Sequence, residues 1–216
     1  MSTTTQGERA SALITATQAL NARAATLKES LDATALEWHP PAGGWSVGQV
    51  FEHLCVANDD YLATLRERLS VTPPFAPGSR TASRWKPSLA GRILVASFES
   101  SRKLPAPKRW RPAPAPRPNV IGEFLGRQRE LVQLIERSMS FDWIRVRMAS
   151  PVSPLVRMNA GDAFTILVTH AERHFRQIDR IRAAYTSAAR ARAAVLEAGL
   201  GTGPSDSPAG LSREPR

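Results

Sequence analysis

Cysteine is almost absent from this chain, which has one, Cys55, among its 216 residues. A single cysteine excludes an internal disulfide framework and fits the reducing environment of a cytoplasm. No apolar run approaches the roughly 18 residues that a membrane span needs. The start of the chain, MSTTTQGERA, also lacks the basic and apolar regions of a signal peptide. We therefore expect a cytoplasmic protein that does not enter a membrane.

Acidic residues are scarce in one segment, and that segment explains most of the net charge of +10. Residues 80–118 hold ten basic residues and one acidic residue, whereas residues 1–79 have more acidic than basic side chains. Basic residues interspersed with tryptophan are typical of nucleic-acid binding. A module that binds nucleic acid or another anionic surface through residues 80–118 is therefore an alternative function. We favour a solvated, mobile insertion, because the excess of basic residues is confined to this one segment and does not describe the surface of the whole protein.

Strand-like alternation is not evident, and helical spacing dominates instead, which predicts an all-α protein. Apolar residues recur at this spacing in four segments, residues 6–31, 46–69, 119–138 and 159–197. Residues 139–158 are expected to be a connection broken by two prolines. Because the long connection falls between the second and third helices, the sequence predicts a four-helix bundle in the order up-down-down-up.

The long connection, residues 70–118, contains ten prolines. This density excludes a continuous helix but leaves room for a short one over residues 87–100. The remainder is expected to be extended or mobile. We expect residues 1–197 to form a single domain that includes this crossover insertion. Residues 198–216, rich in glycine, proline and serine, are expected to be a disordered tail.

Helix-start signals support these boundaries. Ser46 and Gln49 have the spacing of a capping box, and Trp45 is placed to pack on Val50 as a hydrophobic staple. Asn119 and Asn159 are expected to cap the third and fourth helices.

Three of the four histidines fall on the inner faces of predicted helices. His170 and His174 are four residues apart, which places them on one helix face with Cβ atoms about 5–6 Å apart. His53 lies on the second predicted helix. Three imidazoles from two helices can hold one divalent metal ion and leave a coordination position open. The alternative is a set of core histidines satisfied by ordinary hydrogen bonds.

Of the other polar residues, one is a candidate for the metal site and the rest are not. Gln177 lies one turn beyond His174 and is a candidate to bond a ligand, a bound water or a substrate. His39 precedes two prolines in a turn and is left out of the metal site. Cys55 is on the other side of its helix from His53, so we expect a small buried residue. Glu172 is about 200° around the helix from His170, which excludes the zincin arrangement. The inward carboxylates of a di-iron bundle are missing as well.

Two segments, GGWSVGQVFEHL and HAERHFRQI, together resemble the DinB/YfiT-like superfamily, in which metal-dependent enzymes are built on a four-helix bundle. The resemblance covers residues 1–69 and 119–185 and implies that His53, His170 and His174 are the metal ligands. Relatives include thiol-S-transferases and hydrolases. The resemblance therefore implies Zn²⁺ or Ni²⁺ as cofactor, a small thiol or water as the activated group, and a small-molecule substrate.

Two further expectations follow from the same resemblance. Relatives are often dimers, so a homodimer is expected, and a metal-binding dimer without catalysis is a further alternative function. The insertion, residues 70–118, is longer than the crossover of a plain family member. Its tryptophans, Trp85 and Trp110, are interpreted as staples that hold the insertion on the bundle, with a role as anchors of a lid as the alternative.

Overall fold

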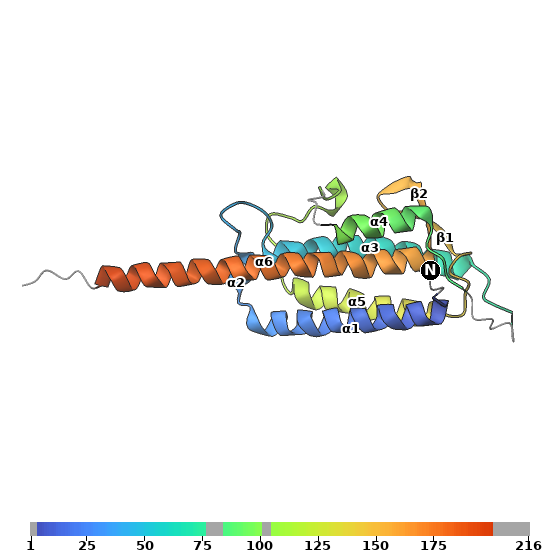
Figure 1. Cartoon of the computed structure of the whole chain (residues 1–216), viewed down its shortest axis with the longest axis horizontal. Helices are drawn as coiled ribbons and strands as arrows, with labels where there is room; N and C mark the ends of the chain where they lie inside the picture. The colour runs from blue at the N-terminus through green and yellow to red at the C-terminus, as the bar shows by residue number, and fades with distance from the viewer. Residues whose placement is uncertain (1–3, 77–83, 101–104, 201–216) are drawn as a thin grey trace, which may run out of the picture.

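The computed structural model describes residues 4–76, 84–100 and 105–200, and these residues are mostly helical (Figure 1). The helices are α1 (Gln6–Ser30), α2 (Ala33–Glu37), α3 (Val47–Val71), α4 (Leu89–Glu99), the short 3-10 helix η1 (Lys108–Trp110), α5 (Val120–Ser138) and α6 (Ala160–Leu200). A small sheet pairs β1 (Arg147–Ser150) with β2 (Ser153–Asn159). Among the described residues, no helix has the length and apolar character to cross a membrane.

The four long helices pack on one another around a core of large apolar side chains. The core includes Phe51 of α3, Phe124 of α5, and Phe164 and Phe175 of α6, all less than 2% exposed. Ion pairs join α3 to α5 in the same order along both helices, from Asp59 with Arg127 to Arg66 with Glu130, as expected of parallel neighbours. The mostly helical character is confirmed, and the complete up-down-down-up order stays a prediction.

Local hydrogen bonds explain where α3 and α6 begin. The Ser46 hydroxyl accepts the Gln49 amide N–H, and the Gln49 side chain accepts the Ser46 amide N–H, both at 3.2 Å. Asn159 and Asp162 exchange the same pair of bonds at 3.0 Å. The predicted caps of these two helices are therefore confirmed, and both helices that carry the histidines have fixed starts.

The predicted cap of α5 is wrong in its mechanism. Asn119 is at the expected position, but its backbone is left-handed, with φ 56°, and its side chain makes no capping hydrogen bond. Asparagine tolerates this conformation better than most residues. The Asn119 side chain instead lies over Gly122, where any Cβ would collide with it. The helix still starts there, because the Asn119 carbonyl accepts the Glu123 amide N–H at 3.0 Å.

The described part of the insertion packs against the helices rather than standing free in solvent. The expected short helix is present as α4, which lies along α6 (Figure 1). Trp85 donates its indole N–H to Asn159 at 3.1 Å, at the start of α6. Gly91 allows α4 to approach, because a Cβ there would collide with the Asp162 side chain. Trp85 thus acts as the predicted staple.

The sequence predicts no strands, and this prediction is wrong, because β1 and β2 form a hairpin. Met148 and Met158 are paired across it and face the core, 2% and 1% exposed. The prolines that suggested a plain loop are compatible with the hairpin. Pro151 lies in the turn. Pro154 lies on a strand of a two-stranded sheet, and each strand has an outer edge where no backbone N–H has to donate to a neighbouring strand.

The last helix is longer than the others and continues past their ends (Figure 1). It reaches Leu200, close to the expected end at residue 197. Of the expected disordered tail, residues 201–216 lie outside the described residues.

Candidate metal centre

The structure brings the three predicted histidines together. His53 projects from the second turn of α3, and His170 and His174 project from adjacent turns of α6. The His170 Nε2 atom lies 3.1 Å from the Nε2 atoms of both His53 and His174. Among the described residues these three form the group whose ligand atoms lie close enough to hold one ion, all within 4.8 Å of one another.

The opposite ring nitrogens of two histidines are held by hydrogen-bond acceptors. His53 Nδ1 lies 2.7 Å from the Trp110 carbonyl, and His174 Nδ1 lies 2.9 Å from Gln177 Oε1. Each oxygen can only accept, so each Nδ1 carries the proton and the Nε2 lone pair is free. Gln177 therefore has the geometry to orient a metal ligand, one of the roles expected of it.

A metal ion fits this arrangement better than hydrogen bonds among the histidines do. A neutral His170 has at most one proton on Nε2 and can donate it to His53 or to His174, but not to both. The Nε2 lone pair of the other histidine would then face His170 without a hydrogen bond. Two nitrogens at about 2.0–2.1 Å from a tetrahedral zinc ion would be about 3.3 Å apart, close to the observed 3.1 Å. The three-histidine site is thus compatible with a divalent metal ion.

Burial prepares the imidazoles as ligands. His53, His170 and His174 are 2%, 6% and 8% exposed. Burial lowers the pKa of His53, and it lowers the pKa of His174 to about 3 with a smaller contribution from His53. Burial, followed by the neighbouring His174 and His53, lowers the pKa of His170 well below its ordinary value. All three are therefore neutral at pH 7, which metal binding requires.

Aromatic rings surround the triad. The Trp45 ring centroid lies 4.9 Å from that of His53, and the Phe98 centroid lies 5.0 Å from that of His170. Trp110 is 6.4 Å from both His53 and His170. The sequence predicts Trp45 only as a helix staple, Trp110 as a staple of the insertion or a lid anchor, and Phe98 not at all. Trp110 and Phe98 both come from the insertion, and no sequence periodicity relates them to the histidines.

The site has a positive electrostatic character. Among the described residues, no carboxylate joins the three histidines in a metal-binding group. The charge of Arg173 contributes to the lowered pKa values of His170 and His174. Three neutral imidazoles leave the full charge of a divalent ion uncompensated, so an open coordination position would favour an anion such as hydroxide or thiolate.

The polar residues that the sequence analysis left out of the metal site lie outside the triad in the structure as well. The His39 Nε2 atom lies 3.0 Å from Gln49 Oε1, at the start of α3. Cys55 is fully buried, and burial raises the pKa of its thiol to about 12, so it is a protonated core residue rather than a nucleophile. Glu172 does not belong to the group of potential ligands found in the described part of the chain.

Comparisons with known proteins agree with the resemblance of the two histidine motifs. Curated proteins and solved structures gave no match. A family model described as DinB superfamily matches residues 15–178, a span that includes α3, the insertion, α5 and the histidines of α6. With this match over most of its length and the three-histidine cluster at its centre, the chain belongs to the DinB superfamily.

Proposed function

We propose that the protein is a metal-dependent enzyme of the DinB-like type, built on an up-down-down-up four-helix bundle. His53, His170 and His174 hold one divalent ion, with Zn²⁺ or Ni²⁺ as the expected metal. The observation that carries the proposal is the convergence of three neutral Nε2 atoms, two of which are oriented by acceptors at Nδ1.

The chemistry of such an ion is the activation of one small group. A bound divalent metal lowers the pKa of a thiol or of water and makes the thiolate or hydroxide available at neutral pH. The chain itself supplies the neutral ligands, the hydrogen bonds that orient them and the aromatic surroundings that exclude water. We therefore infer transfer of a small thiol, or hydrolysis, acting on a small-molecule substrate.

The metal content of purified protein tests this proposal. We expect about one ion per chain in the wild type and in His39→Ala, because His39 lies outside the triad. We expect His170→Ala to lose most of its metal, since two imidazoles bind far more weakly than three. Elemental analysis by mass spectrometry identifies the metal and measures the ratio. Equal metal content in His170→Ala and in His39→Ala would sink the proposal.

Cobalt substitution separates the two reactions. Addition of a small thiol to Co²⁺-loaded protein is expected to produce a sulfur-to-metal charge-transfer band if the thiol occupies the open position. Absence of that band, together with hydrolysis of an activated ester that His170→Ala does not catalyse, would identify water as the activated group. If protein that binds metal shows neither the charge-transfer band nor ester hydrolysis, the non-catalytic alternative is favoured.

The nucleic-acid alternative is less well supported. Arg109 and Arg117 of the insertion are paired with Asp60 and Glu52, at 2.7 and 2.9 Å, and therefore already have anionic partners. Binding to a short DNA duplex that persists at physiological salt would revive this alternative, because weak attraction by net charge alone disappears as salt is added.

A further inference from the structure

The last part of the insertion runs along α3 as a strap, which we define as residues 105–119. The strap reaches the metal centre at η1, where the Trp110 carbonyl accepts the His53 Nδ1–H at 2.7 Å. Trp110 is 5% exposed, and its ring packs beside both His53 and Tyr61. The position of one backbone carbonyl therefore bears directly on the orientation of a candidate metal ligand.

Asp60 holds this turn of the strap in place. It lies on α3, seven residues after His53, and its Oδ2 accepts the Trp110 indole N–H at 2.5 Å. The other carboxylate oxygen accepts a guanidinium N–H from Arg109 at 2.7 Å. Arg109 also donates to the Pro151 carbonyl at 2.8 Å. Hydrogen bonds to a carboxylate are stronger than those between neutral groups, so Asp60 is the strongest local anchor of η1.

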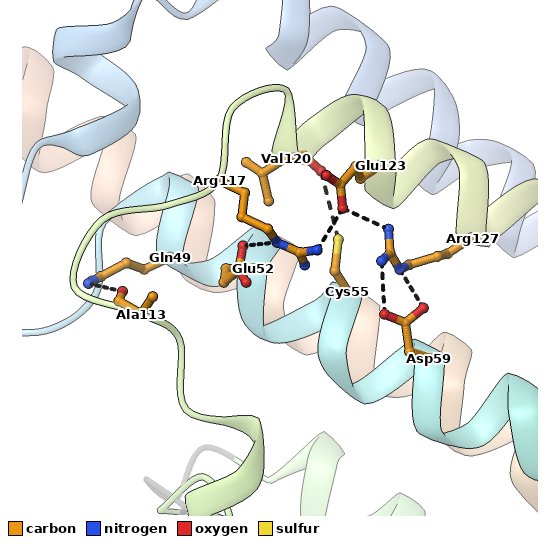
Figure 2. A network of polar contacts seen from close by, with 9 residues as sticks. All are labelled: Gln49, Glu52, Cys55, Asp59, Ala113, Arg117, Val120, Glu123 and Arg127. Carbon is orange, nitrogen blue, oxygen red and sulfur yellow. Dashed lines mark hydrogen bonds and ion pairs between the residues drawn. The ribbon is translucent and has the colours of Figure 1, made fainter.

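The far end of the strap is fixed on the same helix (Figure 2). The Gln49 side-chain amide donates to the carbonyls of Ala113 and Pro114, at 3.1 and 2.9 Å. Gly48 lets the strap pass close to α3, since a Cβ there would lie 2.6 Å from the Pro116 ring. Beyond this point Arg117 pairs with Glu52 at 2.9 Å.

These contacts place His53 between two anchor points of the strap. Gln49 lies one turn before His53 on α3 and Asp60 lies two turns after it, so one helix carries both the ligand and the anchors. The hydrogen bond from the strap can therefore hold a constant geometry relative to the imidazole. Of the two anchors, Asp60 contacts the residue that makes the bond.

We propose that Asp60 is a positioning residue for the metal centre. It clamps η1 so that the Trp110 carbonyl keeps the His53 proton on Nδ1 and directs Nε2 toward His170 and His174. This inference rests on the proposed metal-binding function. Loss of a group that orients a metal ligand typically weakens metal binding about 10- to 100-fold.

A pair of adjacent aspartates supplies a matched experiment. Asp59 is the next residue on α3 and has the same charge, but it pairs with Arg127 of α5, at 2.7 and 2.8 Å, and not with the strap (Figure 2). We expect Asp60→Ala to weaken Zn²⁺ binding about 10- to 100-fold in competition with a chromophoric chelator. Asp59→Ala is expected to stay within about twofold of the wild type, since the groups that orient metal ligands are untouched.

Asp60→Asn tests whether the effect follows the clamp. Asparagine keeps an oxygen for the Trp110 indole but loses the charge that holds Arg109, so an intermediate Zn²⁺ affinity is expected. Urea unfolding of each metal-free variant checks that it is folded. If Asp60→Ala does not fold, the comparison of Asp60→Asn with Asp59→Asn takes its place. Equal Zn²⁺ affinities within that pair would overturn the inference.

The tautomer of His53 gives a readout that does not need metal. In metal-free protein, nitrogen-15 NMR is expected to show the proton on Nδ1 of His53 in the wild type and in Asp59→Ala. In Asp60→Ala a mixture of tautomers is expected. Failure of the wild type to bind either Zn²⁺ or Ni²⁺ would refute the proposed function, whereas an unchanged His53 tautomer in Asp60→Ala would refute the positioning role of Asp60.

Discussion

Each histidine of the triad is held in its neutral form by its surroundings. Burial is the largest cause of the lowered pKa at His53, His170 and His174, and the proximity of the rings adds to it at His170 and His174. A positive charge on one imidazole would also repel a second one on its neighbour, whose Nε2 lies 3.1 Å away in the two closest pairs. At the residue scale, the same packing that prepares the ligands therefore makes the folded protein resist protonation.

This resistance predicts a pH-dependent stability for the metal-free protein. The folded histidines bind fewer protons than the unfolded ones below pH about 6.5, so the free energy of unfolding should fall as the pH decreases from about 6.5 toward 3. The slope is at most about 1.4 kcal/mol per pH unit for each histidine. Urea unfolding with a chelator at pH 7, 6 and 5 measures it. His174→Gln should have a shallower slope, and a pH-independent wild type would contradict the prediction.

The starts of two helices meet at one carboxylate, which joins the insertion to the histidine-bearing helix. Asp162, in the first turn of α6, accepts the Asn159 amide N–H at 3.0 Å. It also accepts the amide N–H of Ser88, the N-cap residue of α4, at 3.1 and 3.2 Å. A negative charge is stabilising at the N-terminus of a helix. At the element scale, Asp162 therefore links α4 to α6.

Removal of this carboxylate should destabilise the protein. We expect Asp162→Ala to lower the free energy of unfolding by roughly 2–3 kcal/mol, because a cap and charge-assisted bonds to a buried and a part-buried amide are lost together. Asp179→Ala is the control on the same helix, since Asp179 is half exposed and pairs with Arg23 at 2.9 Å. Exposed pairs contribute less than about 1 kcal/mol. Equal losses in urea unfolding of the two variants would contradict the role of Asp162.

At the scale of the whole molecule, charge is complementary where the strap crosses α3. There Arg109 pairs with Asp60 and Arg117 pairs with Glu52. The far part of α6 is different, because all of residues 189–197 are exposed. Apolar side chains there, Val195 and Leu196, are 72% and 70% exposed. The described part of the molecule thus consists of a packed body with a projecting helix.

Removal of the projecting helix should leave the packed body intact. For a chain that ends at Ala189, we expect unchanged metal content and a free energy of unfolding within about 0.5 kcal/mol of the wild type, because residues 190–197, the lost residues whose side chains are described, are all exposed. Light scattering coupled to size-exclusion chromatography measures the mass of both proteins. A halved mass with reduced stability would contradict this expectation and assign the expected homodimer to the end of α6.

The sequence was most informative where a feature depends on neighbouring residues. The starts at Ser46 and Asn159 and the pairing of His170 with His174 on one face follow from spacings of three and four residues. The hairpin was missed because two prolines suggested a loop and its strands are short. The left-handed Asn119 was missed because asparagine both caps helices and tolerates this conformation, and only the structure shows its side chain over Gly122.

By itself, the sequence determined the helical segments, the family and the three histidines as candidate ligands, because periodic burial and helix caps produce short-range sequence patterns. Only the tertiary structure decided what surrounds those histidines. The Trp110 carbonyl, the Phe98 ring and the Asp60 clamp come from segments whose distance along the chain from α6 carries no periodic signal. The Trp110 carbonyl approaches the site where the proline-rich strap crosses α3, and Phe98 approaches it where α4 packs along α6. Long-range packing of this kind has no local pattern.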